Sequence, residues 1–176
     1  LTLFQRGKIF ALKIEFSAQK MLSGDNTNEP RESDFESIVS RLKEVIEWMG
    51  VLLTTEQIRR AKSLSFHPSK NIVLSKCYNS TLVIRELAKV DISRKFDIDL
   101  KEFKNGGEVL QFYTNKHALC FYDKIRDLGK PAKRATDKDQ TAKQMSLFDS
   151  LSGEIEILRI EARLNSKKMQ YIFEKI

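Results

Sequence analysis

The chain has 176 residues, which is enough for one domain with a hydrophobic core. Its 41% hydrophobic and 31% charged residues are ordinary for a globular protein, and no apolar run reaches the roughly 20 residues of a membrane-spanning helix. The net charge of +7 favours a polyanionic partner, nucleic acid before membrane, because no strongly basic amphipathic helix is present.

The cysteine content and the first residues of the chain indicate the cellular compartment that we expect. Two cysteines are too few for a disulfide framework, and no secretion signal opens the chain, so we expect a reducing cytoplasm. The first residue is Leu1 rather than methionine. We therefore expect one α+β domain over residues 1–176 that is a fragment of a longer chain.

The first third of the chain predicts one strand and one long helix. Residues 8–16 alternate apolar and polar side chains, which is typical of a half-buried strand. Residues 17–32 are polar and predict a loop. Ser33 and Glu36 are spaced as a capping box, and apolar residues follow at helical spacing until Gly50, which ends the predicted helix.

The middle of the chain predicts short elements. In order, they are a helical turn from Thr54 or Thr55 to Arg60, strands over 63–67 and 71–74, a helix over 80–88 and a charged edge strand over 96–100. In the first of these strands, Leu64 and Phe66 are expected to face the core. In the helix, Val83, Leu87 and Val90 form the expected inner stripe.

A β-hairpin is the most informative feature of the second half. Its strands are expected over 108–114 and 118–124. The lysine-rich residues 126–144 predict a flexible basic loop, followed by a strand over 154–164 and a helix over 167–175. This order predicts a mainly antiparallel sheet with helices packed on one face and a polar face left open.

The residues on the polar face of this sheet can be identified from their positions along each strand, because successive strand residues point to opposite faces. It is expected to contain Lys13, Glu15, Ser65, His67, Cys120, Tyr122, Lys124, Arg159, Glu161 and Arg163.

A tyrosine on this face is a candidate nucleophile for a phosphate. Its hydroxyl must lose a proton, although the ordinary tyrosine pKa is about 10. The positive charges of Lys124, Arg159 and Arg163 would favour the phenolate of Tyr122 and offset the charge that develops on the phosphate.

Carboxylates on the same face are candidate metal ligands. Glu161, together with Glu15 or His67, would hold a divalent ion that polarises the scissile phosphate. Each residue also has a structural interpretation, because a tyrosine packs well on a strand and an Arg-Glu-Arg row is more often a solvated ion-pair ladder. His67, which precedes Pro68, is equally suited to hydrogen-bonding a turn.

Four segments together resemble the replication initiators of filamentous phages, the gene II type, which have relatives on plasmids and prophages. They are the early strand Lys13–Lys20, the segment His67–Asn71, the hairpin segment Phe121–Lys124 and the strand Leu158–Leu164.

The resemblance implies rolling-circle initiation, in which one DNA strand is nicked and rejoined through a 5′-phosphotyrosine without ATP. It implies Tyr122 as the nucleophile, Tyr113 as second choice, and Lys124 as the residue that steadies the phosphate. It implies Mg or Mn as cofactor and Glu161 as a ligand.

Positive side chains would hold the DNA backbone, and we expect this role for Lys13, Lys70, Arg159 and Arg163. The expected partners are single-stranded or supercoiled origin DNA and a host replication helicase, with no membrane. The chain lacks the paired metal-binding histidines of the wider nicking class, and carries Ser63 and Ser65 near a position where related initiators can carry an acid. Two alternatives stay open: a non-catalytic nucleic-acid-binding module using the same face, and a domain whose exposed strands mediate protein assembly.

Overall fold

The computed structural model describes residues 1–24, 28–91, 100–104, 108–128 and 155–173. They group into two compact units, Leu1–Arg60 and Ala61–Ile176, each described by itself. In these described ranges, no helix has the length and apolar character needed to cross a membrane.

The first unit contains a hairpin and three helices. Its elements are β1 (Thr2–Arg6), β2 (Ile9–Lys13), α1 (Ala18–Ser23), a 3-10 turn η1 (Glu32–Asp34), α2 (Phe35–Trp48) and α3 (Thr55–Arg59). The predicted long helix is confirmed as α2, which buries Val39, Leu42 and Ile46. Gly50 follows it with a φ of 81°, a left-handed conformation that glycine adopts without a steric cost.

Two predictions for the first unit are wrong in detail. The segment expected to be a loop contains α1, because Ser17 Oγ accepts a hydrogen bond from the backbone of Lys20 and Gly24 closes the helix. The Ser33–Glu36 capping box is absent. Instead, Asp34 Oδ2 accepts the backbone N–H of Arg31 at 2.7 Å.

The first predicted strand belongs to a different sheet from the one expected. β2 pairs only with β1, through a tight turn in which Gly7 has a φ of 61°. Lys13 and Glu15 therefore belong to the first unit and are not on the large sheet. Because β1 is only a few residues before β2 in the chain, closing the loop between them costs little conformational entropy.

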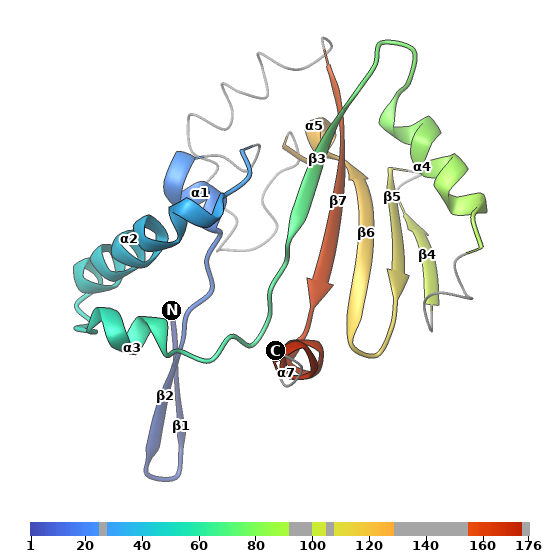
Figure 1. Ribbon diagram of the computed structural model, residues 1–176. Helices are drawn as coiled ribbons and strands as arrows, with labels where there is room; N and C mark the ends of the chain where they lie inside the picture. Colours follow the sequence, from blue (N-terminus) through green and yellow to red (C-terminus); the bar gives the residue numbers. More distant parts are fainter. Residues whose placement is uncertain (25–27, 92–99, 105–107, 129–154, 174–176) are drawn as a thin grey trace. The chain divides into compact units, whose positions relative to one another are not determined.

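The second unit is built on a five-stranded antiparallel sheet (Figure 1). Its strand order is β3 (Ser69–Leu74), β7 (Glu156–Leu164), β6 (His117–Asp123), β5 (Val109–Tyr113) and β4 (Leu100–Lys104). The helices of this unit are α4 (Ser80–Lys89), α5 (Lys124–Leu128) and α7 (Ser166–Phe173). The prediction of an α+β fold with an antiparallel sheet and helices packed against it is confirmed.

The apolar core of the second unit lies between α4 and one face of the sheet. Ile84 of α4 packs against Leu110 and Phe112 of β5 and Leu158 of β7. The start of α4 is fixed to β7 by polar contacts, because Ser80 N and Oγ donate to Glu156 Oε2 at 3.1 and 2.9 Å. The sheet face that α4 covers therefore carries the apolar residues, which alternate along the strands with the polar residues of the other face.

Several predictions for the second unit differ from the structure. Residues 63–67 form no strand: only Phe66 bridges to Leu164, and Leu64 and Phe66 are exposed, because Pro68 interrupts the ladder. Val90 is also exposed and lies beyond the end of α4.

An edge strand was predicted over 96–100. The structure has the edge strand β4 over Leu100–Lys104, and 96–99 lie outside the described residues. The predicted basic loop begins inside α5, and 129–144 lie outside the described residues as well.

Candidate functional site

Strand register brings four of the expected site residues together on one sheet face. Tyr122 of β6 lies opposite Arg159 of β7, and Cys120 lies opposite Glu161. Arg163 follows two residues further along β7 and so shares the face. This part of the parity prediction is confirmed. We call Tyr122, Arg159, Glu161 and Arg163 the carboxylate cluster.

The Glu161 carboxylate is the centre of this cluster. Tyr122 Oη donates a hydrogen bond to Glu161 Oε2 at 2.9 Å, and Arg163 Nε donates to Oε1 at 2.7 Å. Arg159 Nε lies 3.9 Å from Oε2. Both oxygens of the carboxylate are thus engaged, one by a phenol and the other by a guanidinium.

The electrostatics of the cluster favour a charged carboxylate and a neutral phenol. Burial would raise the pKa of Glu161, but the hydrogen bond and charge of Arg163, the Tyr122 hydroxyl and the charge of Arg159 together lower it. Burial and the negative charge of Glu161 raise the pKa of Tyr122, against the charge of Arg159. The resting state is therefore a tyrosine hydroxyl held by a carboxylate.

The face carrying this cluster is largely covered, in contrast to the predicted open face. The side chains of Arg159 and Glu161 are only 7% and 12% exposed, and Cys120 is buried. Arg163 is 41% exposed. A ligand from solution therefore meets the cluster first at Arg163.

His67 is the second exposed group beside the carboxylate. Its Nδ1 lies 4.0 Å from Glu161 Oε1, and its side chain is 52% exposed. The backbone on either side of it is pinned to β7, because Phe66 bridges to Leu164 and Pro68 O accepts the N–H of Ala162 at 2.9 Å. The structure thus brings His67 and Glu161 together as the sequence expected, although His67 lies outside any strand.

The expected metal ligands do not fit a cation as they lie here. Both oxygens of Glu161 already accept hydrogen bonds, and two arginines lie beside the carboxylate; Glu15 belongs to the first unit, which is described by itself. Within the described ranges, no three His, Cys, Asp or Glu side chains gather closely enough to hold a metal ion.

Lys124 does not face the cluster from a strand as predicted. β6 ends at Asp123, whose Oδ1 accepts the N–H of Arg126 at 2.9 Å and so starts α5 at Lys124. The Lys124 side chain is only 2% exposed, and its Nζ lies 3.3 Å from Asp127 Oδ2. It is a buried structural group in this structure, out of reach of a phosphate in solution.

The second-choice tyrosine and the remaining lysines lie elsewhere. Tyr113 pairs with Ala118 and so shares the face of Tyr122, but its hydroxyl donates to Gln111. Lys70 pairs with Ile160 and points to the opposite face from the cluster, because strand parity separates it from Ser69, the residue opposite Glu161. Lys13 is beside Glu15 in the first unit.

Sequence reasoning missed a basic group at one end of the sheet. Lys116 of the β5–β6 turn and Lys168 of α7 lie on the ring of Tyr171. The contact joins residues about 50 positions apart. One feature of the sequence could have indicated this basic group: residues 162–173 contain no Asp or Glu. The prediction of a helix at the end of the chain did not take this into account.

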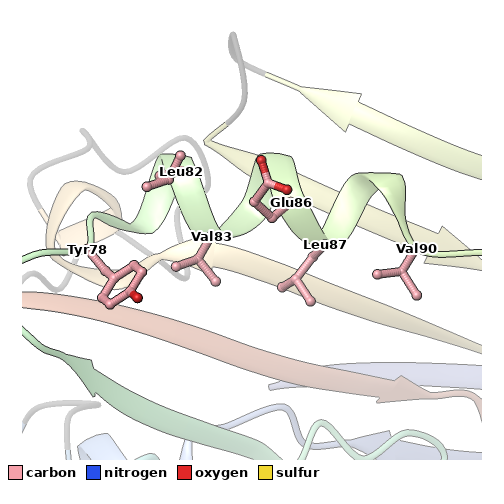
Figure 2. Close-up of a pocket in the computed structure, with 6 residues that line it drawn as sticks. All are labelled: Tyr78, Leu82, Val83, Glu86, Leu87 and Val90. Carbon is pink, nitrogen blue, oxygen red and sulfur yellow. The ribbon is translucent and has the colours of Figure 1, made fainter.

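A separate apolar hollow follows α4 (Figure 2). Its volume is about 500 Å³, and it is lined by Tyr78, Leu82, Val83, Glu86, Leu87 and Val90. Figure 2 shows Val83 and Leu87 on the side of α4 toward the strands, and Leu82 and Glu86 on the other side. Among its described lining residues, Glu86 is the only charged one, and it is paired with Lys89.

Comparisons of this chain with models of protein families, with curated proteins and with solved structures gave no match.

Proposed function

We propose that this protein initiates rolling-circle DNA replication by nicking a single DNA strand and rejoining it through Tyr122. The observation that carries the proposal is the Tyr122 hydroxyl donating to Glu161 between two arginines. A nucleophile, a proton acceptor and two phosphate-binding cations are the groups that such a transfer needs. The motif resemblance and the net charge of +7 point the same way.

The chemical step transfers a phosphoryl group without loss of a high-energy bond. Tyr122 Oη attacks the phosphorus of a phosphodiester, its proton passes to Glu161, and the bond from phosphorus to the 3′ oxygen breaks. The 3′ oxygen takes up a proton from water and leaves as a hydroxyl, Glu161 returns its proton to water, and the 5′ phosphate stays on the tyrosine. Attack by a 3′ hydroxyl on the phosphotyrosine reverses each of these changes and rejoins the strand.

Arg163 links phosphate binding to the proton transfer. At rest its hydrogen bond and charge keep the pKa of Glu161 low, so the carboxylate is a weak base. A phosphate that attracts the Arg163 guanidinium removes this restraint and makes Glu161 a better acceptor for the phenolic proton. Since Arg163 is the exposed member of the cluster, it meets the phosphate before Tyr122 does.

Mg or Mn is the cofactor that the resemblance implies. Because the described ligands do not fit a cation as they lie, no step above is routed through a metal. The cofactor requirement is tested by running the same assay with and without a chelator.

A second function, a nucleic-acid-binding module without catalysis, is favoured by one observation. The groups of this region that reach solvent are Arg163 and His67, whereas Tyr122 is half-buried and its pKa is raised. Such a module binds single-stranded DNA with a steep salt dependence and forms no covalent product.

The deciding experiment is a covalent-adduct assay. The protein is incubated with random-sequence single-stranded oligonucleotides labelled at the 3′ end, in Mg, Mn or EDTA, and run on a denaturing gel. The proposal expects label on the protein band, because the 5′ phosphate of the labelled fragment stays on Tyr122. Label at the 5′ end should instead be released.

Two variants with the same substitution decide the residue. Tyr122→Phe should abolish the adduct, while Tyr113→Phe, on the same face but bonded to Gln111, should retain it. The reverse pattern rejects Tyr122 and keeps the class of reaction. Adduct formation by both variants rejects Tyr122 as the required nucleophile. No adduct with the wild type or with either variant rejects the nicking function, and salt-dependent binding alone then supports the binding module.

A further inference from the structure

One end of the sheet is organised by contacts between the β5–β6 turn and the start of α7. Asn165 N donates to Lys116 O at 3.2 Å, and Asn165 Nδ2 donates to Asn115 O at 3.1 Å. Asn165 Oδ1 also accepts the N–H of Lys168 at 3.2 Å, which caps α7. A single asparagine thus fixes the turn and the helix relative to each other.

An exposed tyrosine lies between two lysines at this end. Lys116 Nζ is 5.3 Å and Lys168 Nζ 5.2 Å from the centre of the Tyr171 ring. Tyr171 is 42% exposed, and the neighbouring Lys167 is exposed as well. We call Lys116, Lys167, Lys168 and Tyr171 the basic end.

Acidic residues are absent from the two described segments that form the basic end. Residues 109–122 and 162–173 contain no Asp or Glu. Among the described residues, none of its three lysines forms an ion pair with a carboxylate. Burial together with the charge of Lys168 lowers the pKa of His117 in the same turn. Within these two segments, an anion would meet three lysines and no acid.

The basic end continues into the exposed side of the carboxylate cluster. Arg163 is the last basic residue of β7, with only Leu164 and Asn165 between it and α7. Lys116 directly precedes β6, which carries Tyr122 six residues later. Six strand residues span roughly 20 Å, which is a distance of several nucleotides.

We infer that the basic end is the docking surface for single-stranded DNA that leads to the carboxylate cluster, with a base stacked on Tyr171 and phosphates on Lys116 and Lys168. The inference rests on the proposed function for its substrate. Stacking on an aromatic ring is stronger than an exposed cation–π contact, so a base displaces a lysine ammonium from the ring. The displaced lysine then lies beside the adjoining phosphate.

The test is binding of labelled single-stranded oligothymidylate to the full chain by fluorescence anisotropy, over a range of salt concentrations. Tyr171→Ala should weaken binding by roughly 5- to 150-fold, while Tyr171→Phe, which keeps a ring, should bind as the wild type does. Lys116→Gln with Lys168→Gln should reduce the slope of log affinity against log salt by about 1.4, since each phosphate contact contributes about 0.7.

The matched control is Lys76→Gln. Lys76 is exposed and follows β3 at the end where Leu74 pairs with Glu156, which is the other end of β7 from the basic end. This variant should leave the affinity and the salt slope unchanged. Circular dichroism checks that each variant is folded, and if Tyr171→Ala fails to fold, the double lysine variant decides.

Several results would overturn the inference. They are an absence of binding by the wild type, equal losses in Lys76→Gln and the double lysine variant, or Tyr171→Ala binding as tightly as Tyr171→Phe. Binding of a blunt duplex that is tighter than that of the single strand would also reject stacking on Tyr171. Tyr122→Phe separates the two proposals, since it should bind normally and form no adduct.

Discussion

Replacing Glu161 by Gln is expected to destabilise the protein far more than the same change at a surface ion pair. The substitution removes the charge that faces Arg159 and Arg163 but keeps an oxygen that accepts from Tyr122. Arg159 is only 7% exposed, so its guanidinium would stay buried after losing the Glu161 carboxylate, which lies 3.9 Å from it. Removing one partner of a buried pair costs roughly 3–5 kcal/mol. Because Arg163 is 41% exposed and can rehydrate, we expect a loss of about 2–4 kcal/mol.

The matched control is Glu86→Gln in α4. Glu86 pairs with Lys89 at 2.6 Å, but the two side chains are 59% and 69% exposed. An exposed helical pair of this spacing is worth about 0.2–0.5 kcal/mol. Urea unfolding at neutral pH gives both free energies of unfolding, and adding Arg163→Gln completes a double-mutant cycle for the buried pair.

The expected coupling between Glu161 and Arg163 is about 1–3 kcal/mol. A loss in Glu161→Gln within about 0.5 kcal/mol of that in Glu86→Gln would refute the reasoning, since it would mean that the cluster is as hydrated as the surface. An unchanged m-value between variants is required, because a changed one would indicate a different unfolded or native state.

Three further results are expected. The folded-state pKa of Glu161 is lowered, so its contribution to the free energy of unfolding is fully present above its unfolded pKa of about 4.3 and is lost as pH falls through the folded value. Urea unfolding from pH 6 to pH 3 should show this loss of stability in the wild type and not in Glu161→Gln. Lys124→Ala should lower the free energy of unfolding by about 2–4 kcal/mol, because it leaves a cavity beside Asp127. The slope of log DNA affinity against log salt should stay unchanged, and a changed slope with a stable fold would place Lys124 on the DNA. Ser80→Ala should cost about 1–3 kcal/mol in the same assay, because Glu156 loses a buried donor, whereas exposed Ser37→Ala should change little.

The alternation of side chains along β6 and β7 was enough to predict which residues share a face. Tyr122, Arg159, Glu161 and Arg163 lie on one side because strand parity has a period of two, whatever the rest of the fold does. The long helix α2 was likewise predictable from its apolar spacing, since a helix needs only local hydrogen bonds and one buried stripe. These features depend on residues that are close in the chain.

Local patterns misplaced features that depend on a competing partner. Lys124 was expected on the strand, but the carboxylate of Asp123 caps a new helix there and buries the lysine. The strand containing Lys13 was expected in the large sheet, but β1 is its partner across a short turn. In both cases a neighbouring group offered a hydrogen bond that the pattern of apolar residues does not reveal.

The sequence by itself therefore determined an antiparallel α+β fold and the face shared by Tyr122, Arg159, Glu161 and Arg163. Only the tertiary structure decided that Glu161 is buried against two arginines, that His67 lies next to it, and that Lys116 and Lys168 meet on Tyr171. The physical reason is that periodicity fixes the direction of a side chain, whereas the contacts of Glu161 with Tyr122 and His67 depend on segments about 40 to 95 positions away in the chain.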